Sequence, residues 1–317
     1  MRCLSLADAL NEHGVVCIFV TSDLKCERLI SNQGYECICI NSRWDDYCDG
    51  ADELCAIANR YGCDCVVTDS YYTNSKYFDA IHDYCRTVII SEDIPNGNLK
   101  NIDLFINYNI YVNEVDSEVF NYDTCLGTKY ALLRKEFSRN KCGSGDCVLV
   151  LSGGTDPLNI ASHMLKRLRR SLPDGTRIIT VTSSMNMYIE DLRRVSERYN
   201  IELFVDVRDM LKVYKEAAVA VSAGGSTLYE LCACGIPTVT FAYVDNQIKN
   251  VEGFHKAQIM PYAGYYPDDP QSVSDLVIEF ILKTLKNNQF SADVSTKMRG
   301  ICDGNGANRV AHRMMFF

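Results

Sequence analysis

Several features that mark common classes of protein are missing from this sequence. It contains no apolar run near the ~18–20 residues that a membrane-spanning helix needs. Its opening residues, MRCLSLADALNEHG, lack the apolar core of a signal peptide. Basic residues are not in excess, because 32 Lys and Arg stand against 41 Asp and Glu, for a net charge of −9. We therefore predict neither a membrane partner nor a broad nucleic-acid footprint, although a local basic pocket is compatible with this charge.

The common short motifs for metals and nucleotides are absent as well. Neither C-x-x-C nor H-E-x-x-H occurs, and there is no G-x-x-x-x-G-K-[ST] or G-x-G-x-x-G loop. The five histidines fall in or beside helix-like runs, which favours surface or packing roles; they are His13, His82, His163, His255 and His312. We predict no metal and no cofactor.

Cysteine, by contrast, is abundant, with 16 residues, twelve of which lie in the first 142 positions. The pairs Cys37/Cys39, Cys63/Cys65 and Cys232/Cys234 have C-x-C spacing, which is narrower than most zinc sites use. We interpret the cysteines as buried, reduced thiols, with metal sites or disulfides as the alternative. This usage predicts a reducing, cytoplasmic compartment.

The length of 317 residues suggests about two domains. Strand-like and helix-like runs alternate along the chain, and the continuously apolar strands are typical of parallel sheets covered on both faces. The pattern restarts after the polar stretch 138–146, the best linker candidate. We therefore predict an α/β fold of two doubly wound, Rossmann-like domains, 1–138 and 146–317, facing a cleft.

The expected strands are 15–20, 35–40, 63–68, 86–91, 147–152, 177–182, 201–205, 218–222 and 237–242. The expected helices are 3–13, 22–33, 50–61, 74–84, 157–171, 186–199, 207–216, 225–235, 246–260 and 271–287. The first element is thus a helix that has no strand before it and no Ser, Thr, Asp or Asn as its N-cap. Topology alone leaves open whether a first strand is missing or the domain simply starts on a helix.

The strongest local signal is a glycine-rich turn between a strand and a helix. The apolar run 218–222 leads into Gly224, Gly225, Ser226 and Thr227, and a helix follows. Glycines let backbone N–H groups approach a ligand closely, and a helix N-terminus attracts phosphate. Glu230 lies one turn further on, where it could reach a ribose hydroxyl pair. The alternative is an ordinary helix cap with Glu230 in solvent.

A second glycine-rich turn has the same setting. SGGTDPLN (152–159) includes Gly153, Gly154, Asp156 and Asn159, between an expected strand and an expected helix. Pro157 suits the first helical turn, and Asp156 is an N-cap candidate. Two such turns in one domain suggest a diphosphate or an extended nucleotide-sugar, while two capped loops are the alternative.

Polar residues also follow other strands. Asp69, Tyr71 and Tyr72 come after the first-domain run CDCVVT, where they could orient a substrate hydroxyl or amide. Asn246 and Gln247 follow PTVTFAYVD in the second domain and could bind a polar ligand. Capping and packing are the alternative for both groups.

Together, these residues make the sequence resemble the UDP-2,4-diacetamido-2,4,6-trideoxy-β-L-altropyranose hydrolases of pseudaminic acid biosynthesis. These enzymes are related to the GT-B glycosyltransferase of peptidoglycan synthesis that transfers N-acetylglucosamine. The segments that carry the resemblance occur in order along the chain: MRCLSLADAL, TDSYYTN, EDIPN, FINYN, KYALLRKEF, SGGTDPLN, SAGGSTLYEL, DNQ and DGNGANRV.

The resemblance implies a GT-B-like fold, substrate contacts in both domains and a monomer that binds a UDP-sugar. It places the diphosphate at Gly224–Thr227, the ribose at Glu230 and the uracil near Val207 to Met210. Asn246, Gln247, 153–156 and Asn159 would lie near the phosphates or the sugar, and Asp69 and Tyr71 would face the sugar. The implied catalytic residues are Tyr71, Asp69 and Asn246. The implied reaction is metal-independent, inverting attack of water on the anomeric carbon, which releases UDP and the free sugar.

The sequence also departs from this family. Its members begin with a strand and a loop ending in Gly-His, whose histidine is the proposed general base, directly before the Met-Arg-Cys segment. This chain starts at Met1, and none of its histidines matches that position. We expect a truncated gene model or an internal start codon, with a genuine short protein of altered activity as the alternative.

Three functions are therefore in competition. The first is UDP-sugar hydrolysis. The second is a GT-B glycosyltransferase with a UDP-sugar donor, although no basic-apolar patch for a membrane-bound acceptor is recognisable in the first domain. The third is a catalytically impaired UDP-sugar binding protein.

Overall fold

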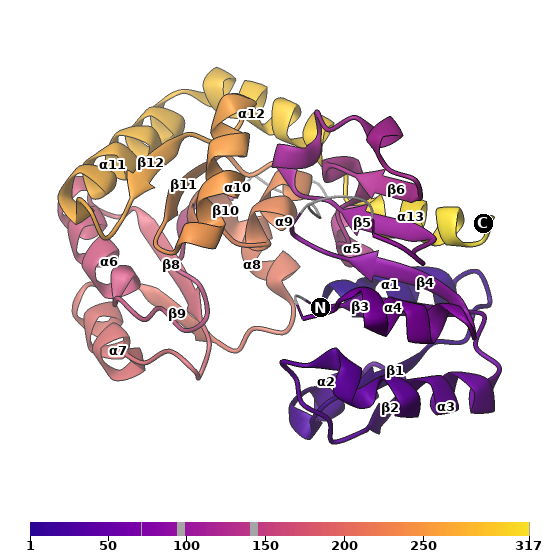
Figure 1. Cartoon of the computed structure of the whole chain (residues 1–317). Coiled ribbons are helices and arrows are strands. Elements are labelled where there is room, and N and C mark those ends of the chain that lie inside the picture. Colours follow the sequence, from indigo (N-terminus) through magenta and orange to yellow (C-terminus); the bar gives the residue numbers. More distant parts are fainter. Residues whose placement is uncertain (71, 94–98, 140–144, 317) are drawn as a thin grey trace. The chain divides into compact units, whose positions relative to one another are not determined.

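The chain folds into two compact units in a computed structural model that describes residues 1–70, 72–93, 99–139 and 145–316 (Figure 1). The first unit comprises Met1–Lys135 together with Asn305–Phe317, and the second comprises Glu136–Gly304. This division differs from the predicted ranges 1–138 and 146–317, because the last helix returns to the first unit, where it packs on the first helix. Part of the predicted linker, 140–144, lies outside the described residues.

The second unit is built on one parallel sheet of six strands in the order β12-β11-β10-β7-β8-β9. Its strands are β7 (Cys147–Leu151), β8 (Arg177–Thr182), β9 (Glu202–Val205), β10 (Ala217–Ala223), β11 (Thr238–Ala242) and β12 (Tyr262–Tyr265). Its helices are α5 (Glu136–Arg139), α6 (Ile160–Ser171), α7 (Ile189–Arg198), α8 (Met210–Glu216), α9 (Thr227–Cys234), α10 (Asp245–Lys256), α11 (Pro270–Lys286) and α12 (Asn288–Ile301).

One hydrophobic cluster of the second unit lies between its central strands and three helices. Side chains of β7, β8, β10 and β11 pack against the apolar faces of α6, α7 and α11. In α6 the buried positions include Ile160, Met164, Leu165 and Leu168, the spacing that places apolar residues on one helical face. Every residue of β7 and of β11 is buried, as expected for inner strands of a doubly wound sheet.

The first unit contains two separate parallel sheets. One pairs β1 (Ile18–Thr21) with β2 (Glu36–Cys39), and the other has the order β3-β4-β5-β6. The second of these is formed by β3 (Cys65–Asp69), β4 (Arg86–Ile90), β5 (Leu104–Asn107) and β6 (Asp123–Leu126). The helices are α1 (Arg2–Asn11), α2 (Glu27–Ser31), α3 (Ala51–Tyr61), α4 (Ser75–His82) and α13 (Gly306–Met314). Short 3-10 helices occupy Leu24–Cys26, Tyr47–Gly50, Ile110–Val112, Ser117–Val119 and Thr128–Tyr130.

The two sheets of the first unit differ in burial. All four residues of β5 are buried, whereas every residue of β1 is only half-buried. Among the described residues, β1 pairs only with β2 and β3 pairs only with β4, so each has one open edge. The predicted α/β fold with parallel sheets is confirmed, but the first unit divides its strands between two sheets.

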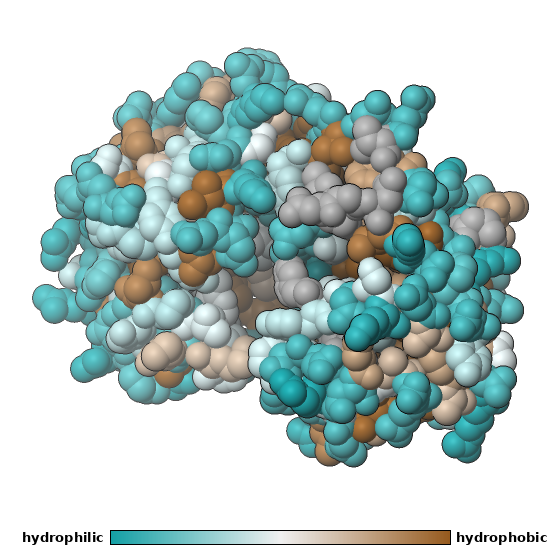
Figure 2. Space-filling view, viewed as in Figure 1, coloured by the Kyte–Doolittle hydropathy of each residue, from teal (hydrophilic) through white to brown (hydrophobic). Residues whose placement is uncertain are grey.

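The predicted strands and helices all correspond to elements of the structure, with ends shifted by a few residues. The element list derived from periodicity missed β5, β6, β12, α5, α12 and α13. FINYN, taken as a strand by resemblance alone, overlaps β5. Within the described residues no helix combines the length and the apolar character needed to cross a membrane. Figure 2 shows hydrophilic residues over most of the visible face, with scattered hydrophobic patches.

Candidate functional site

Three neighbouring strands precede most of the predicted site residues of the second unit; Val207 and Met210 follow the edge strand β9 instead. β10 pairs with β7 on one side and with β11 on the other, and all three run parallel. The turns after β7 and β10 contain Gly153–Asp156 and Gly224–Ser226, and Asn246–Gln247 lie in the first turn of α10, the helix that follows β11. Because parallel strands end at the same edge of a sheet, the fold brings together three segments that are far apart in the sequence (Figure 1).

The turn after β10 combines one crowded glycine with one open glycine. A Cβ atom on Gly224 would lie 2.6 Å from Val251 Cγ1 and 2.9 Å from Gln247 Cβ, so this position must be glycine for α10 to pack against it. A Cβ atom on Gly225 would meet nothing within 4 Å. Helix α9 begins at Thr227. The backbone N–H groups of Gly225, Leu228 and Tyr229 donate to the carbonyl oxygens of Ala223, Gly225 and Ser226, which leaves those of Ser226 and Thr227 without an acceptor among the described residues. The turn therefore offers accessible backbone donors at a helix N-terminus.

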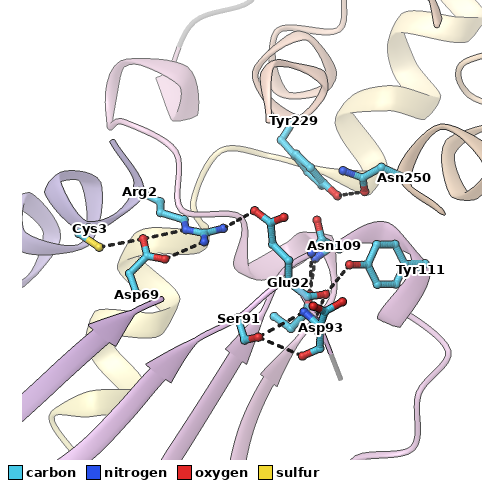
Figure 3. A network of polar contacts seen from close by, with 11 residues as sticks. Arg2, Cys3, Asp69, Ser91, Glu92, Asp93, Asn109, Tyr111, Tyr229 and Asn250 are labelled. Carbon is cyan, nitrogen blue, oxygen red and sulfur yellow. Dashed lines mark hydrogen bonds and ion pairs between the residues drawn. The ribbon is translucent and has the colours of Figure 1, made fainter. Parts of the chain in front are cut away.

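Glu230 is already engaged within its own unit. Its Oε2 accepts a hydrogen bond of 2.7 Å from the hydroxyl of Tyr214, a fully buried residue of α8. The neighbouring Tyr229 hydroxyl donates to Asn250 Oδ1 at 2.6 Å, which ties α9 to α10 (Figure 3). Tyr214 thus fixes the orientation of the carboxylate that was predicted to reach a ribose.

The turn after β7 is organised by Asp156. Its carboxylate accepts hydrogen bonds from the N–H groups of Ile160 (2.8 Å) and Ala161 (2.9 Å) and from Ser152 Oγ (3.1 Å). Only 1% of this residue is exposed, and its side chain caps the first amides of α6. The predicted N-cap position was wrong, because the N-cap residue is Asn159 and the helix begins at Ile160, after Pro157. Gly153 and Gly154 are exposed, and Gly153 has φ of 92°, a left-handed conformation that favours glycine.

The remaining predicted residues of the second unit have mixed surroundings. Asn159 Nδ2 donates to Asp191 Oδ2 at 2.9 Å, and this hydrogen bond lowers the pKa of Asp191. Gln247 Oε1 accepts from the backbone N–H of Tyr243 at 3.1 Å, whereas Asn246 is exposed. Val207 lies in the loop before α8, and Met210 is the first residue of that helix.

In the first unit, Asp69 ends β3 and is bound by the first residue of α1. Arg2 Nε lies 2.9 Å from Asp69 Oδ2, and Arg2 Nη2 lies 2.7 Å from Asp69 Oδ1. The third guanidinium nitrogen, Nη1, lies 2.9 Å from Glu92 Oε1, and Figure 3 shows the guanidinium between the two carboxylates. Burial disfavours the charge, yet the hydrogen bond with Asp69 raises the pKa of Arg2 above its ordinary value, so Arg2 stays charged.

The structure describes one of the two tyrosines predicted beside Asp69. Tyr71 lies outside the described residues. Tyr72 is 45% exposed, and its ring packs edge-on against Trp44 with centroids 5.4 Å apart. Of the histidines, His255 Nδ1 accepts the backbone N–H of Tyr262 at 3.2 Å, which is a structural contact.

Sequence reasoning missed Arg2 and Glu92 as members of this arrangement. Arg2 belongs to the MRCLSLADAL segment and Glu92 to EDIPN, both of which were noted only for resemblance. Glu92 follows the strand β4, and this position at the carboxyl end of a parallel strand was the available signal.

The thiol of Cys3 also contacts the Asp69 carboxylate. Its Sγ lies 3.2 Å from Asp69 Oδ2, and burial together with the Asp69 charge raises the pKa of the Cys3 thiol to about 12. Only the thiolate reacts with iodoacetamide, so Cys3 should be labelled very slowly at pH 8 and progressively faster up to about pH 12. Asp69→Asn should accelerate labelling at pH 8, and Asp52→Asn, on the exposed part of α3, should not. Mass spectrometry of labelled peptides measures the rate. Equal labelling of Cys3 in both variants would show that burial alone, without the Asp69 charge, raises the pKa of the thiol.

With the geometry of both units described, comparison with known proteins identifies the family. The profile of the glycosyltransferase family 28 C-terminal domain matches residues 148–312. The chain belongs to this family. The matched range contains all of the second-unit turns described above.

Curated proteins with different names are similar in sequence to part of this chain. An uncharacterized protein of Methanocaldococcus jannaschii is 24% identical over 75% of this chain and 51% of its own length. The UDP-2,4-diacetamido-2,4,6-trideoxy-β-L-altropyranose hydrolase of Campylobacter jejuni is 28% identical over 46% of this chain and 54% of its own length. A Helicobacter pylori enzyme is 24% identical over 53% of this chain and 50% of its own length; its name is UDP-N-acetylglucosamine–N-acetylmuramyl-(pentapeptide) pyrophosphoryl-undecaprenol N-acetylglucosamine transferase. The chain spans about half the length of these curated relatives.

Solved structures establish the fold. MurG of Acinetobacter baumannii has a TM-score of 0.70 and 14% identity, over 100% of this chain and 95% of that one. A glycosyltransferase of Rickettsia africae has a TM-score of 0.68 and 11% identity, over 99% of this chain and 93% of that one. The fold class predicted from the sequence, two Rossmann-like domains of the GT-B type, is confirmed.

Proposed function

We propose that this protein is an enzyme that binds a UDP-sugar and breaks the bond between the anomeric carbon and the diphosphate oxygen. The observation that carries the proposal is the adjacency of the turns after β7 and β10, with the open Gly225 and the N-terminus of α9 at the edge of the sheet. Backbone N–H groups and the helix dipole suit the diphosphate. Glu230, oriented by Tyr214, is the candidate ribose contact.

The preferred reaction is hydrolysis of a UDP-2,4-diacetamido-2,4,6-trideoxyhexose, with water as the acceptor. Water attacks the anomeric carbon with inversion, the C–O bond to the diphosphate breaks, and UDP and the free sugar leave. UDP is a good leaving group, and the N-terminal donors of α9 would stabilise the negative charge that develops on it. The Campylobacter relative and the ordered sequence motifs support this choice of substrate, as a route to pseudaminic acid.

Transfer of the sugar to another acceptor is the second candidate. The family profile is that of a glycosyltransferase domain, and the Helicobacter relative is named as a transferase. Both reactions use the same nucleotide contacts and break the same bond. They differ in whether water or a hydroxyl of a second substrate takes the sugar.

Release of UDP in the absence of any acceptor distinguishes the two reactions. If the protein is a hydrolase, incubation with the UDP-diacetamido sugar in buffer should yield UDP and free sugar in equal amounts. Chromatography measures the released UDP, and NMR measures the free sugar. If it is a transferase, UDP should accumulate only after an acceptor is added. If calorimetry detects UDP binding but no turnover occurs under either condition, the protein is a catalytically impaired UDP-sugar binding protein. If UDP does not bind at all, the hydrolase, the transferase and the binding protein are all refuted.

A further inference from the structure

A cavity of about 350 Å³ lies in the first unit, between α13 and the 3-10 helix that follows β6. This volume is at the lower end of the range for small-molecule sites, about 300–1,000 Å³. The residues that line the cavity are Tyr130, Asn305, Asn308, Arg309, His312 and Arg313. All six belong to the first unit, so the cavity is complete within it.

Helix α13 presents one polar face to this cavity and buries the opposite face. Five of the lining residues follow one another at spacings of three, one, three and one from Asn305 to Arg313, which places them on a single side of the helix. The buried face consists of Gly306, Ala307, Val310 and Ala311, and α13 packs on α1. The buried face therefore holds the polar stripe in place.

Two close contacts fix the walls of the cavity. A Cβ atom on Gly306 would lie 2.3 Å from the carbonyl oxygen of Ala131, so this position must be glycine for α13 to lie against the chain after β6. Arg309 Nη1 donates to the carbonyl oxygen of Lys129 at 2.9 Å. The cavity is thus built by tertiary packing and does not depend on a bound molecule for its shape.

The charge around the cavity is opposite to that of the whole protein. The chain has a net charge of −9, yet the lining contains Arg309 and Arg313 and no acidic residue. Lys129 adds a cation beside it, with Nζ 5.0 Å from the ring centroid of Tyr130. One carboxylate, that of Asp123 in β6, lies 3.0 Å from Arg313 Nη2. Three cations against one carboxylate leave a local net charge of +2.

The donors of this cavity match a phosphate group. A guanidinium presents its N–H groups as a planar fork that can bond two oxygens of one phosphate. A phosphate monoester carries a charge of about −2 at neutral pH, which the local charge balances. One water molecule takes about 30 Å³ of liquid, so the cavity has room for much more than a single phosphate ion. The amides of Asn305 and Asn308 supply both donors and acceptors for a polar organic part.

We propose that this cavity binds a small phosphate monoester of the sugar-phosphate type, at a site other than the candidate nucleotide site of the second unit. The cavity is built from two segments that the proposed function leaves without a role: KYALLRKEF, which contains Tyr130, and DGNGANRV, which contains Asn305, Asn308 and Arg309. The inference goes beyond the proposed function and does not rest on it.

Calorimetry with glucose 6-phosphate, inorganic phosphate and glucose tests the inference. The wild-type protein should bind glucose 6-phosphate with a dissociation constant below about 1 mM, inorganic phosphate more weakly and glucose not measurably. Gly225→Asp should bind glucose 6-phosphate as the wild type does, because the new carboxylate blocks only the turn after β10. Absence of binding, or binding that Gly225→Asp abolishes, would overturn the inference. Equal affinity for inorganic phosphate would overturn the assignment of a monoester. If UDP does not bind but glucose 6-phosphate does, the proposed function fails and this inference stands.

Two variants of one ion pair place the ligand in the cavity. Arg313→Gln should weaken glucose 6-phosphate binding about tenfold, because it removes a charge-assisted hydrogen bond. Asp123→Asn breaks the same ion pair but keeps the guanidinium, so it should strengthen binding about two- to fivefold. Loss of stability alone would shift both variants in the same direction. Arg28→Gln, on an exposed position of α2, is the matched control and should bind as the wild type does. Wild-type affinity in Arg313→Gln, or equal weakening in both ion-pair variants, would show that the ligand does not occupy this cavity.

Discussion

A Gly225→Asp variant is expected to fold with the stability of the wild-type protein yet to bind UDP at least about 100-fold more weakly. The added Cβ would meet nothing within 4 Å, and Gly225 is not among the glycines with positive φ, so the backbone accepts a side chain. The new carboxylate would lie at the N-terminus of α9, where a negative charge is stabilising. The Gly225→Asp variant should therefore keep its stability while it loses affinity for UDP.

The loss has an electrostatic cause. A carboxylate at this turn would take the donors proposed for the diphosphate and repel its negative charge. One pair of charges at 4–5 Å costs roughly 3–4 kcal/mol at an effective dielectric constant of about 20. That energy corresponds to a factor of a few hundred in the dissociation constant, which calorimetry with UDP measures directly.

Two matched variants separate charge from shape. Gly225→Asn has nearly the same size without the charge, and its UDP affinity should stay within about tenfold of the wild type. Gly224→Ala should instead lower the stability of the protein, because its Cβ would overlap Val251 and Gln247. Overpacking of this kind lowers the free energy of unfolding by about 1–3 kcal/mol. If Gly225→Asp binds UDP as the wild type does, the diphosphate does not lie at this turn.

The sequence allowed the architecture of the second unit to be predicted well, for a physical reason. Of its inner strands, β7 is a continuous apolar run of five residues and β10 is apolar except for Ser222, and a helix follows each of them. The strands that were missed are β5, β6 and β12, each only four residues long. Two of them include polar or glycine positions that interrupt the pattern: DTCL and YAGY.

The candidate site could be predicted only where its residues are close together in the chain. The turn Gly224–Thr227 is a local signal, and the cap formed by Asp156 spans five residues or fewer. The pairing of Arg2 with Asp69 and Glu92 joins residues 67 and 90 positions apart, which no local pattern encodes. Similarly, the separation of β1 and β2 from the sheet of β3 to β6 depends on which strands pair, which is a property of the tertiary fold.

Removal of the Asp156 carboxylate should have the largest effect on stability. Asp156→Ala would leave the Ser152 hydroxyl and the amides of Ile160 and Ala161 without their buried acceptor. The loss of a buried, charged acceptor at a helix start should lower the free energy of unfolding of the second unit by about 2–4 kcal/mol. Urea denaturation followed by circular dichroism measures this change.

The comparison of two replacements at this position distinguishes a cap from a ligand contact. Asp156 has φ of 37°, so alanine adds backbone strain, whereas Asp156→Asn tolerates this conformation and keeps one acceptor oxygen. We expect Asp156→Asn to lose about half as much stability as Asp156→Ala, and the exposed Asp174→Ala to change it by less than about 0.5 kcal/mol. Both Asp156 variants should weaken UDP binding only in proportion to their destabilisation, because the carboxylate oxygens are already occupied by the chain itself. A stable Asp156→Ala protein that no longer binds UDP would show instead that this carboxylate serves the ligand and that α6 is capped by other groups.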